Sequence, residues 1–114
     1  ILAWLPENEI ERIIRQKGLP QFTRSTITDF DALKESLRLV RRFGFAIDRE
    51  EFLPGVVCIG TALRDYSGTV LGSISCTLPD SRATDENIEI VKQAVLDCVT
   101  ELSRKLGRPK GDSV

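Results

Sequence analysis

The sequence predicts an α/β domain of the α+β type, in which helices pack on one antiparallel sheet. Two β-branched runs, Val56 to Leu63 and Thr69 to Leu78, are joined by a short polar connection that favours a hairpin. Apolar residues at helical spacing come before these runs and again after them. Because only three strands are recognisable beside three helices, we expect a partial domain whose other strands lie upstream.

Two helices are predicted in the first part of the chain. Ile1 to Leu5 has the pattern of a helix end, Pro6 suits the first turn of the next helix, and Gly18 ends that helix. A Thr- and Ser-rich extended connection, Gln21 to Thr28, leads to a second helix that ends at Gly44. The exposed face of this second helix is charged, and we interpret it as a solvated surface rather than a phosphate-binding patch. The apolar stripes are Ile10, Ile13 and Ile14, then Phe30, Leu33, Leu37 and Val40.

The middle of the chain predicts the strands. Phe45 to Ile47 is a short strand, and Asp48 to Gly55 is a polar loop closed by a Pro-Gly turn. In the connection Arg64 to Gly68, Asp comes early and Gly late, which predicts a type I turn with Gly68 in the left-handed conformation.

A long amphipathic helix is predicted after the hairpin. Thr84 caps this helix, acidic residues favour its first turn, and Gly107 and Pro109 end it. Residues 108–114 are expected to form a disordered tail. The apolar positions of the helix are Ile88, Val91, Val95, Cys98, Val99, Leu102 and Leu106.

Composition narrows the functional classes. The chain has 114 residues and a formal net charge of -1, without the clustered basic charge typical of nucleic-acid binding. Histidine is absent, which removes His-activated nucleophiles and the commonest zinc ligand, so no catalysis, metal or cofactor is expected. Three cysteines without a CxxC pair favour a reducing, cytoplasmic location. No apolar run approaches the roughly 20 residues of a membrane span, so no membrane partner is expected.

The start of the chain indicates a piece of a longer protein. Ile1 stands inside an apolar pattern, and the chain contains no methionine. We therefore interpret residues 1–114 as the C-terminal part of one domain.

A carboxylate, a thiol and two hydroxyls are candidates for one binding surface. Residues two apart on a strand share a face, so Ser75 and Thr77 point the same way. If the two runs pair from the ends of their connection, Cys58 faces Ser75, with Thr77 one step along. The hydroxyls can donate to a ligand carboxylate or carbonyl, whereas ionised Asp48 accepts from a hydroxyl, an amide or water. The set predicts a pocket for a hydroxy acid or a hydrated keto acid.

Other interpretations stay open on the residues alone. Alternating Ser and Thr are also typical of the wet face of a hairpin, and Asp48 can cap a turn through backbone N–H groups. An assembly module would pair its apolar helix faces and leave the pocket vestigial. An enzyme with Cys58 as nucleophile is disfavoured because the sequence offers no base to activate the thiol. Cys76 and Cys98 are expected in the core as small apolar residues.

The same segments resemble the effector-binding domain of the IclR family of bacterial transcriptional regulators. Residues 44–51, 55–60 and 74–82 are similar to the family patterns GYAxDxEE, GxxCIAxPV and SVSGPxxR. Residues 1–6 and 26–29 match as well, so the similarity covers nearly the whole chain.

The resemblance implies a GAF- or profilin-like fold with a curved antiparallel sheet, working as a homodimer or tetramer. It implies that a small organic acid is the effector and that Asp48, Cys58, Ser75 and Thr77 line its site. It also implies that DNA is bound only through an N-terminal winged helix-turn-helix that this chain lacks. Leu78 stands where the family has Gly and is expected to narrow the site or change its backbone. Upstream of Ile1, a glycine-rich turn of the family also contacts effectors.

Overall fold

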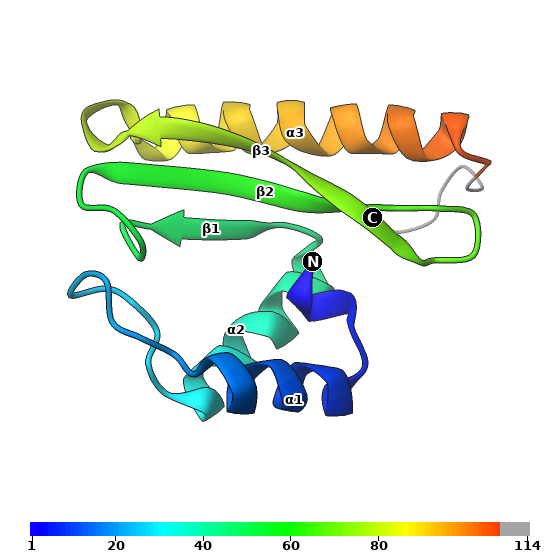
Figure 1. The fold of residues 1–114 in the computed structure, drawn as a ribbon. Coiled ribbons are helices and arrows are strands. Elements are labelled where there is room, and N and C mark those ends of the chain that lie inside the picture. Colours follow the sequence, from blue (N-terminus) through cyan, green and yellow to red (C-terminus); the bar gives the residue numbers. More distant parts are fainter. Residues whose placement is uncertain (108–114) are drawn as a thin grey trace.

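The computed structural model describes residues 1–107, and the tail predicted over 108–114 lies outside the described residues. Figure 1 shows α3 running alongside β2 and β3, whereas η1, α1 and α2 lie beyond β1. The predicted helices and strands occur in the predicted order, and a short helix that was not predicted, η2, precedes α3. The elements are η1 (Leu2–Trp4), α1 (Glu7–Lys17), α2 (Phe30–Phe43), β1 (Ala46–Arg49), β2 (Val56–Arg64), β3 (Val70–Pro79), η2 (Asp80–Arg82) and α3 (Asp85–Lys105).

The helix boundaries follow from their caps. The Asp29 carboxylate accepts the Ala32 N–H at 3.0 Å before α2, and the Thr84 hydroxyl accepts the Asn87 N–H at 3.2 Å before α3. Gly44 ends α2 with φ 84°, a left-handed conformation in which Gly avoids the steric cost of a Cβ. The predicted starts of both helices are therefore confirmed by the hydrogen bonds that make them.

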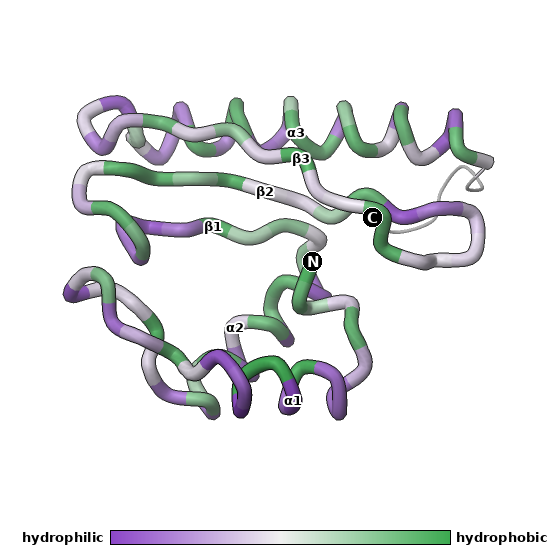
Figure 2. The backbone as a smooth tube through the Cα atoms, viewed as in Figure 1, coloured by the Kyte–Doolittle hydropathy of each residue, from purple (hydrophilic) through white to green (hydrophobic). Residues whose placement is uncertain are grey.

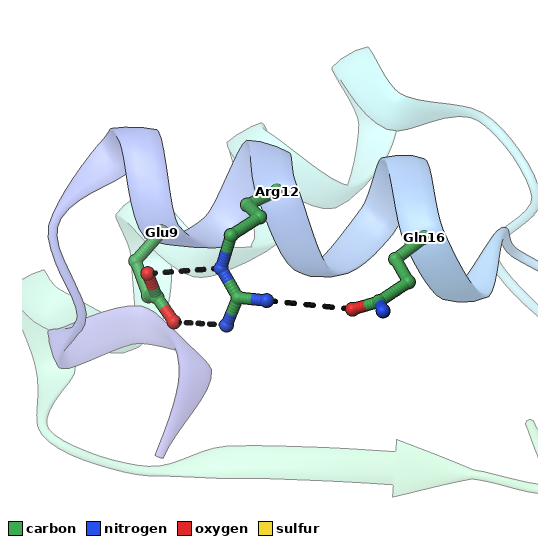
Figure 3. Close-up of polar contacts among 3 residues, drawn as sticks. All are labelled: Glu9, Arg12 and Gln16. Carbon is green, nitrogen blue, oxygen red and sulfur yellow. Dashed lines mark hydrogen bonds and ion pairs between the residues drawn. The ribbon is translucent and has the colours of Figure 1, made fainter.

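The outer face of α1 carries a polar network that supports the helix itself. Arg12 Nε donates to Glu9 Oε2 at 3.2 Å, and Arg12 Nη1 donates to Gln16 Oε1 at 3.3 Å (Figure 3). The hydrogen bond from Arg12 lowers the pKa of Glu9. Because these side chains lie on the solvent side of one helix, they stabilise α1 weakly and form no site.

The apolar side chains gather in two separate groups. In the helical half, residues 1–44, Ala3 and Ile10 pack with Leu37. In the sheet half, residues 45–107, Ile59 and Val99 are fully buried between β2 and α3, and the apolar stretch of β2 stands out in Figure 2. The other buried apolar side chains of the sheet half are Val57, Ala62, Ile88 and Val95.

The sheet has three antiparallel strands in the order β1-β2-β3. β1 is longer than predicted, because Asp48 pairs with Cys58 and Arg49 with Val57. Asp48 is therefore the third residue of a strand and not the first residue of a loop.

The predicted pairing of Cys58 with Ser75 is wrong by two residues. Cys58 pairs with Thr77, and Gly60 pairs with Ser75. The turn takes in Thr69, whose carbonyl accepts the Asp65 N–H at 2.9 Å, and the register shifts once more at Leu63/Arg64. A displacement of two residues leaves every side chain on its predicted face, so the grouping survives the error.

Polar and ring contacts connect the helical half to the sheet half. The Arg64 guanidinium lies 4.0 Å from the centre of the Trp4 ring. The Thr61 hydroxyl donates to the Gly44 carbonyl at 2.6 Å. A third connection runs through Thr23 and Thr26 and is described with the site below.

Within residues 1–107, the structure contains no helix with the length and apolar character needed to cross a membrane.

Candidate functional site

The four candidate residues lie on one face of the sheet. Asp48, Cys58 and Thr77 form one row across the three strands, and Ser75 lies in the next row, opposite Gly60. The Thr77 hydroxyl lies 3.7 Å from Cys58 Sγ, so it is directed toward the thiol. The strand pairing therefore brings together the carboxylate, the thiol and both hydroxyls.

The part of this face that carries Ser75 and Thr77 is not enclosed by residues 1–107, although Ala62 on the same face is only 3% exposed. Ser75 and Thr77 are exposed, and Cys58 is partly buried. The reason lies in the packing of α3, which covers the opposite face through the alternate residues Val57 and Ile59. Within residues 1–107, Cys58, Ser75 and Thr77 thus form a polar floor that no described segment encloses.

The floor is small as well as polar. A Cβ added at Gly60 would stand 3.3 Å from the Ser75 Cβ, which is tighter than ordinary contact. The absence of a Cβ at Gly60 therefore gives the Ser75 side chain room on this face.

Asp48 also performs the capping role that the sequence left open. Its Oδ1 accepts the Glu51 N–H at 2.7 Å, and the Arg49 N–H donates to Glu51 Oε2 at 3.3 Å. Partial burial raises the pKa of Glu51, and the neighbouring charge of Asp48 acts in the same direction. The carboxylate of Asp48 is thus held by the turn that follows β1.

Leu78 does not narrow the candidate face. It pairs with Val57, whose side chain is 2% exposed on the α3 side of the sheet. The expectation that Leu78 constricts the site is therefore wrong, because residue 78 alternates to the side opposite Thr77.

The two remaining cysteines have different environments. Cys76 is partly buried and pairs with Ile59 on the α3 side. Cys98 is exposed, so its predicted place in the core is wrong. In a helix of 3.6 residues per turn, Cys98 lies about 100° round from its buried neighbour Val99.

The sequence interpretation overlooked Thr23 and Thr26, which join the α1–α2 connection to the turn after β1. The Thr23 hydroxyl donates to the Glu50 carbonyl, and the Thr26 hydroxyl donates to the Glu51 carbonyl. The signal was the density of Ser and Thr in this connection, because these side chains often bond to nearby backbone in place of regular structure.

A groove of about 550 Å³ lies elsewhere, between η1, α1 and α2. Its floor is apolar, and acidic and basic residues are balanced on its rim. This balance gives no reason to assign a charged ligand to it, and no candidate residue lines it. The charged rim residues are Glu7, Asp31, Glu35, Lys34, Arg38 and Arg41.

No cluster of three or more His, Cys, Asp or Glu side chains is arranged for a metal ion in the part of the chain that the structure describes.

The family model described as "Bacterial transcriptional regulator IclR C-terminal" matches residues 1–104. The chain belongs to the IclR family. The HTH-type transcriptional repressor AllR of Escherichia coli K12 is 37% identical over 107 residues, which cover 94% of this chain and 40% of AllR. The chain thus spans about 40% of the length of this IclR relative. The family model and this relative are both described as transcriptional regulators.

Solved structures show the same IclR C-terminal, GAF-like fold. The Thermotoga maritima IclR structure has a TM-score of 0.87 and 34% identity, and the match covers 94% of this chain and 43% of that chain. The PobR inducer-binding domain from Acinetobacter, a double mutant in complex with 3-hydroxybenzoic acid, has a TM-score of 0.83 and 25% identity. That match covers 90% of this chain and 59% of that chain. The predicted fold class and family are confirmed.

Proposed function

We propose that this chain is the ligand-sensing part of an IclR-type regulator in the bacterial cytoplasm, and that its effector is a small organic acid. The effector controls DNA binding by a helix-turn-helix domain outside this chain. In the favoured mechanism, the acid stabilises one arrangement of a homodimer or tetramer, and DNA affinity changes through that shift in population.

The observation that carries the proposal is the row formed by Asp48, Cys58 and Thr77, with Ser75 beside it. Two hydroxyls and a thiol offer donors to a carboxylate, and Asp48 supplies an acceptor at one end of the row. An acid with its own hydroxyl satisfies both requirements. The 3-hydroxybenzoic acid in the PobR domain has this pairing of groups, on a related fold.

A thermal-shift screen of the full-length protein tests the proposal. The panel contains 3-hydroxybenzoate together with 2-hydroxy and 2-keto acids of two to four carbons. An acid that binds the folded form raises the melting temperature in proportion to RT ln(1 + [L]/Kd), which is about 2.7 kcal/mol at 100 times Kd.

Matched variants localise the binding. Ser75→Ala is expected to reduce the shift, whereas Ser73→Ala, on the same face one row further along β3, is expected to preserve it. Equal losses in both variants, or a panel without any shift, would contradict the proposal.

The alternative function is an assembly module with a vestigial pocket. Light scattering on Ser75→Ala and Thr77→Ala separates the two, because the sensor keeps its oligomeric state while losing its ligand response. A loss of assembly in these variants would favour the module.

A further inference from the structure

We infer that Thr23 and Thr26, in the connection between α1 and α2, are positioning residues that hold the carboxylate of Asp48 at the candidate site. We call this arrangement the threonine clasp, meaning the two threonine hydroxyls and the Glu50 and Glu51 carbonyls that they bind. The inference rests on the proposed function in that it gives the clasp a role in effector binding.

The Thr26 hydroxyl uses its full hydrogen-bonding capacity. It accepts the Phe22 N–H at 3.0 Å and the Thr23 N–H at 2.9 Å, and it donates to the Glu51 carbonyl. A hydroxyl has one donor and two acceptor sites, so all three are used. Thr26 therefore folds its own loop and attaches that loop to the turn after β1.

Thr23 makes the neighbouring attachment. Its hydroxyl donates to the Glu50 carbonyl at 2.5 Å and accepts the Ser25 N–H at 3.0 Å. The Phe22 and Phe52 rings meet edge to face, with centroids 5.1 Å apart, where the two loops come together. The two loops thus contact each other through adjacent backbone carbonyls and an aromatic pair.

The turn that receives these bonds contains a strained backbone conformation. Glu50 has φ 59° and is the single non-glycine residue with positive φ among residues 1–107. Such a conformation costs a non-glycine residue about 1–2 kcal/mol. Two further hydrogen bonds at Glu50 compensate for this conformational cost. The Glu50 N–H donates to the Val56 carbonyl at 3.1 Å, and the Gly55 N–H donates to Glu50 Oε1 at 2.7 Å.

The clasp reaches Asp48 through Glu51. One end of the Glu51 backbone donates its N–H to Asp48 Oδ1 at 2.7 Å, and the other end offers its carbonyl to Thr26. The Glu51 N–H shares one planar peptide unit with the Glu50 carbonyl, so the bond from Thr23 to that carbonyl fixes the direction of the N–H and, with it, the Asp48 carboxylate. Thr26 supports this unit by accepting the Thr23 N–H and by holding the next peptide unit through the Glu51 carbonyl. In this way a loop of the helical half sets the geometry of the acceptor beside Cys58.

Hydrogen exchange of the full-length protein tests the clasp without any ligand. Thr26→Val keeps the shape and removes the hydroxyl, and it is expected to raise the exchange rate of the Glu51 amide about tenfold through easier local opening. Thr26→Ser keeps the hydroxyl and is expected to restore the slow rate. Thr28→Val changes an exposed threonine of the same loop and serves as the control.

The result that overturns the inference is a Glu51 exchange rate in Thr26→Val equal to that of the wild type. An increase of the same size at the Ile59 amide in β2 also overturns it, because the variant would then loosen the whole sheet rather than the turn.

Binding of the first acid that stabilises the wild type gives a second readout. Thr26→Val is expected to weaken that binding by several-fold and Thr26→Ser to restore it, whereas Asp48→Asn combined with Thr26→Val adds little to Asp48→Asn alone. Unchanged binding in Thr26→Val overturns the positioning role. A panel in which no acid binds refutes the proposed function, while the exchange rates still decide whether the clasp holds the turn.

Discussion

Replacing Thr61 with Val tests one of the contacts that join the helical half to the sheet half. Thr61 is 5% exposed, and its hydroxyl donates to the Gly44 carbonyl at 2.6 Å. Gly44 is itself buried at the end of α2. Valine has nearly the same shape as threonine, so the variant removes the hydrogen bond and leaves the packing volume almost unchanged.

The expected loss is about 1–2 kcal/mol of unfolding free energy. A buried acceptor that loses its donor costs about 1–3 kcal/mol. The added apolar methyl offsets up to about 0.8 kcal/mol of that cost.

Urea denaturation of the wild type and Thr61→Val measures the difference from the transition midpoints at constant slope. Thr100→Val is the control, because Thr100 is exposed on α3. If Thr61→Val is as stable as the control, the bond between β2 and the end of α2 makes no net contribution and the reasoning is wrong.

Two further predictions concern titration and reactivity. Partial burial raises the pKa of Glu51 above its ordinary value of 4.5, so its ionised form costs stability at neutral pH, and Glu51→Gln is expected to stabilise the protein at pH 7. This gain should shrink as the pH falls toward 4.5, and urea midpoints at pH 7 and pH 4 that show an equal gain would contradict it. Exposed Cys98 is expected to react with iodoacetamide faster than partly buried Cys76, as followed by peptide mass spectrometry, and the reverse order would refute the burial assignment.

The order and type of the elements were predictable because local signals agree with the packing. Gly18 and Gly44 end helices where the sequence placed them, and Thr84 caps α3 as expected. The positive φ of Gly68, 87°, also matches its prediction. In each case a residue with a strong backbone preference stands at the boundary, so few neighbours are needed to decide the structure.

The hairpin register and the place of Cys98 depended on information that is not local. The register depends on which residues form the turn and on the register shift at Leu63/Arg64. Cys98 stands one residue before buried Val99, and only the contact of α3 with the sheet selects between them. Thr23 and Thr26 were overlooked because their partners lie 27 and 25 residues further along the chain.

The candidate face was predictable in its membership and not in its exposure. Residues an even number of positions apart on a strand share a face. Ser75 and Thr77 therefore stay on the same face as Cys58 even when the pairing is displaced by two residues. Whether a face is covered depends on what packs on it, and α3 covers the other side. The residue pattern of one strand therefore does not determine which face of the sheet a helix covers.

The division of the apolar side chains into two groups bears on how the domain opens locally. Leu37 and its neighbours form one group, and Ile59 and its neighbours form the other. The hydrogen bond from Thr61 to Gly44 and the contact of Arg64 with the Trp4 ring connect the two halves. Regions of this kind open as separate cooperative units. We therefore expect amides of the helical half and amides of the sheet half to exchange with different free energies of local opening.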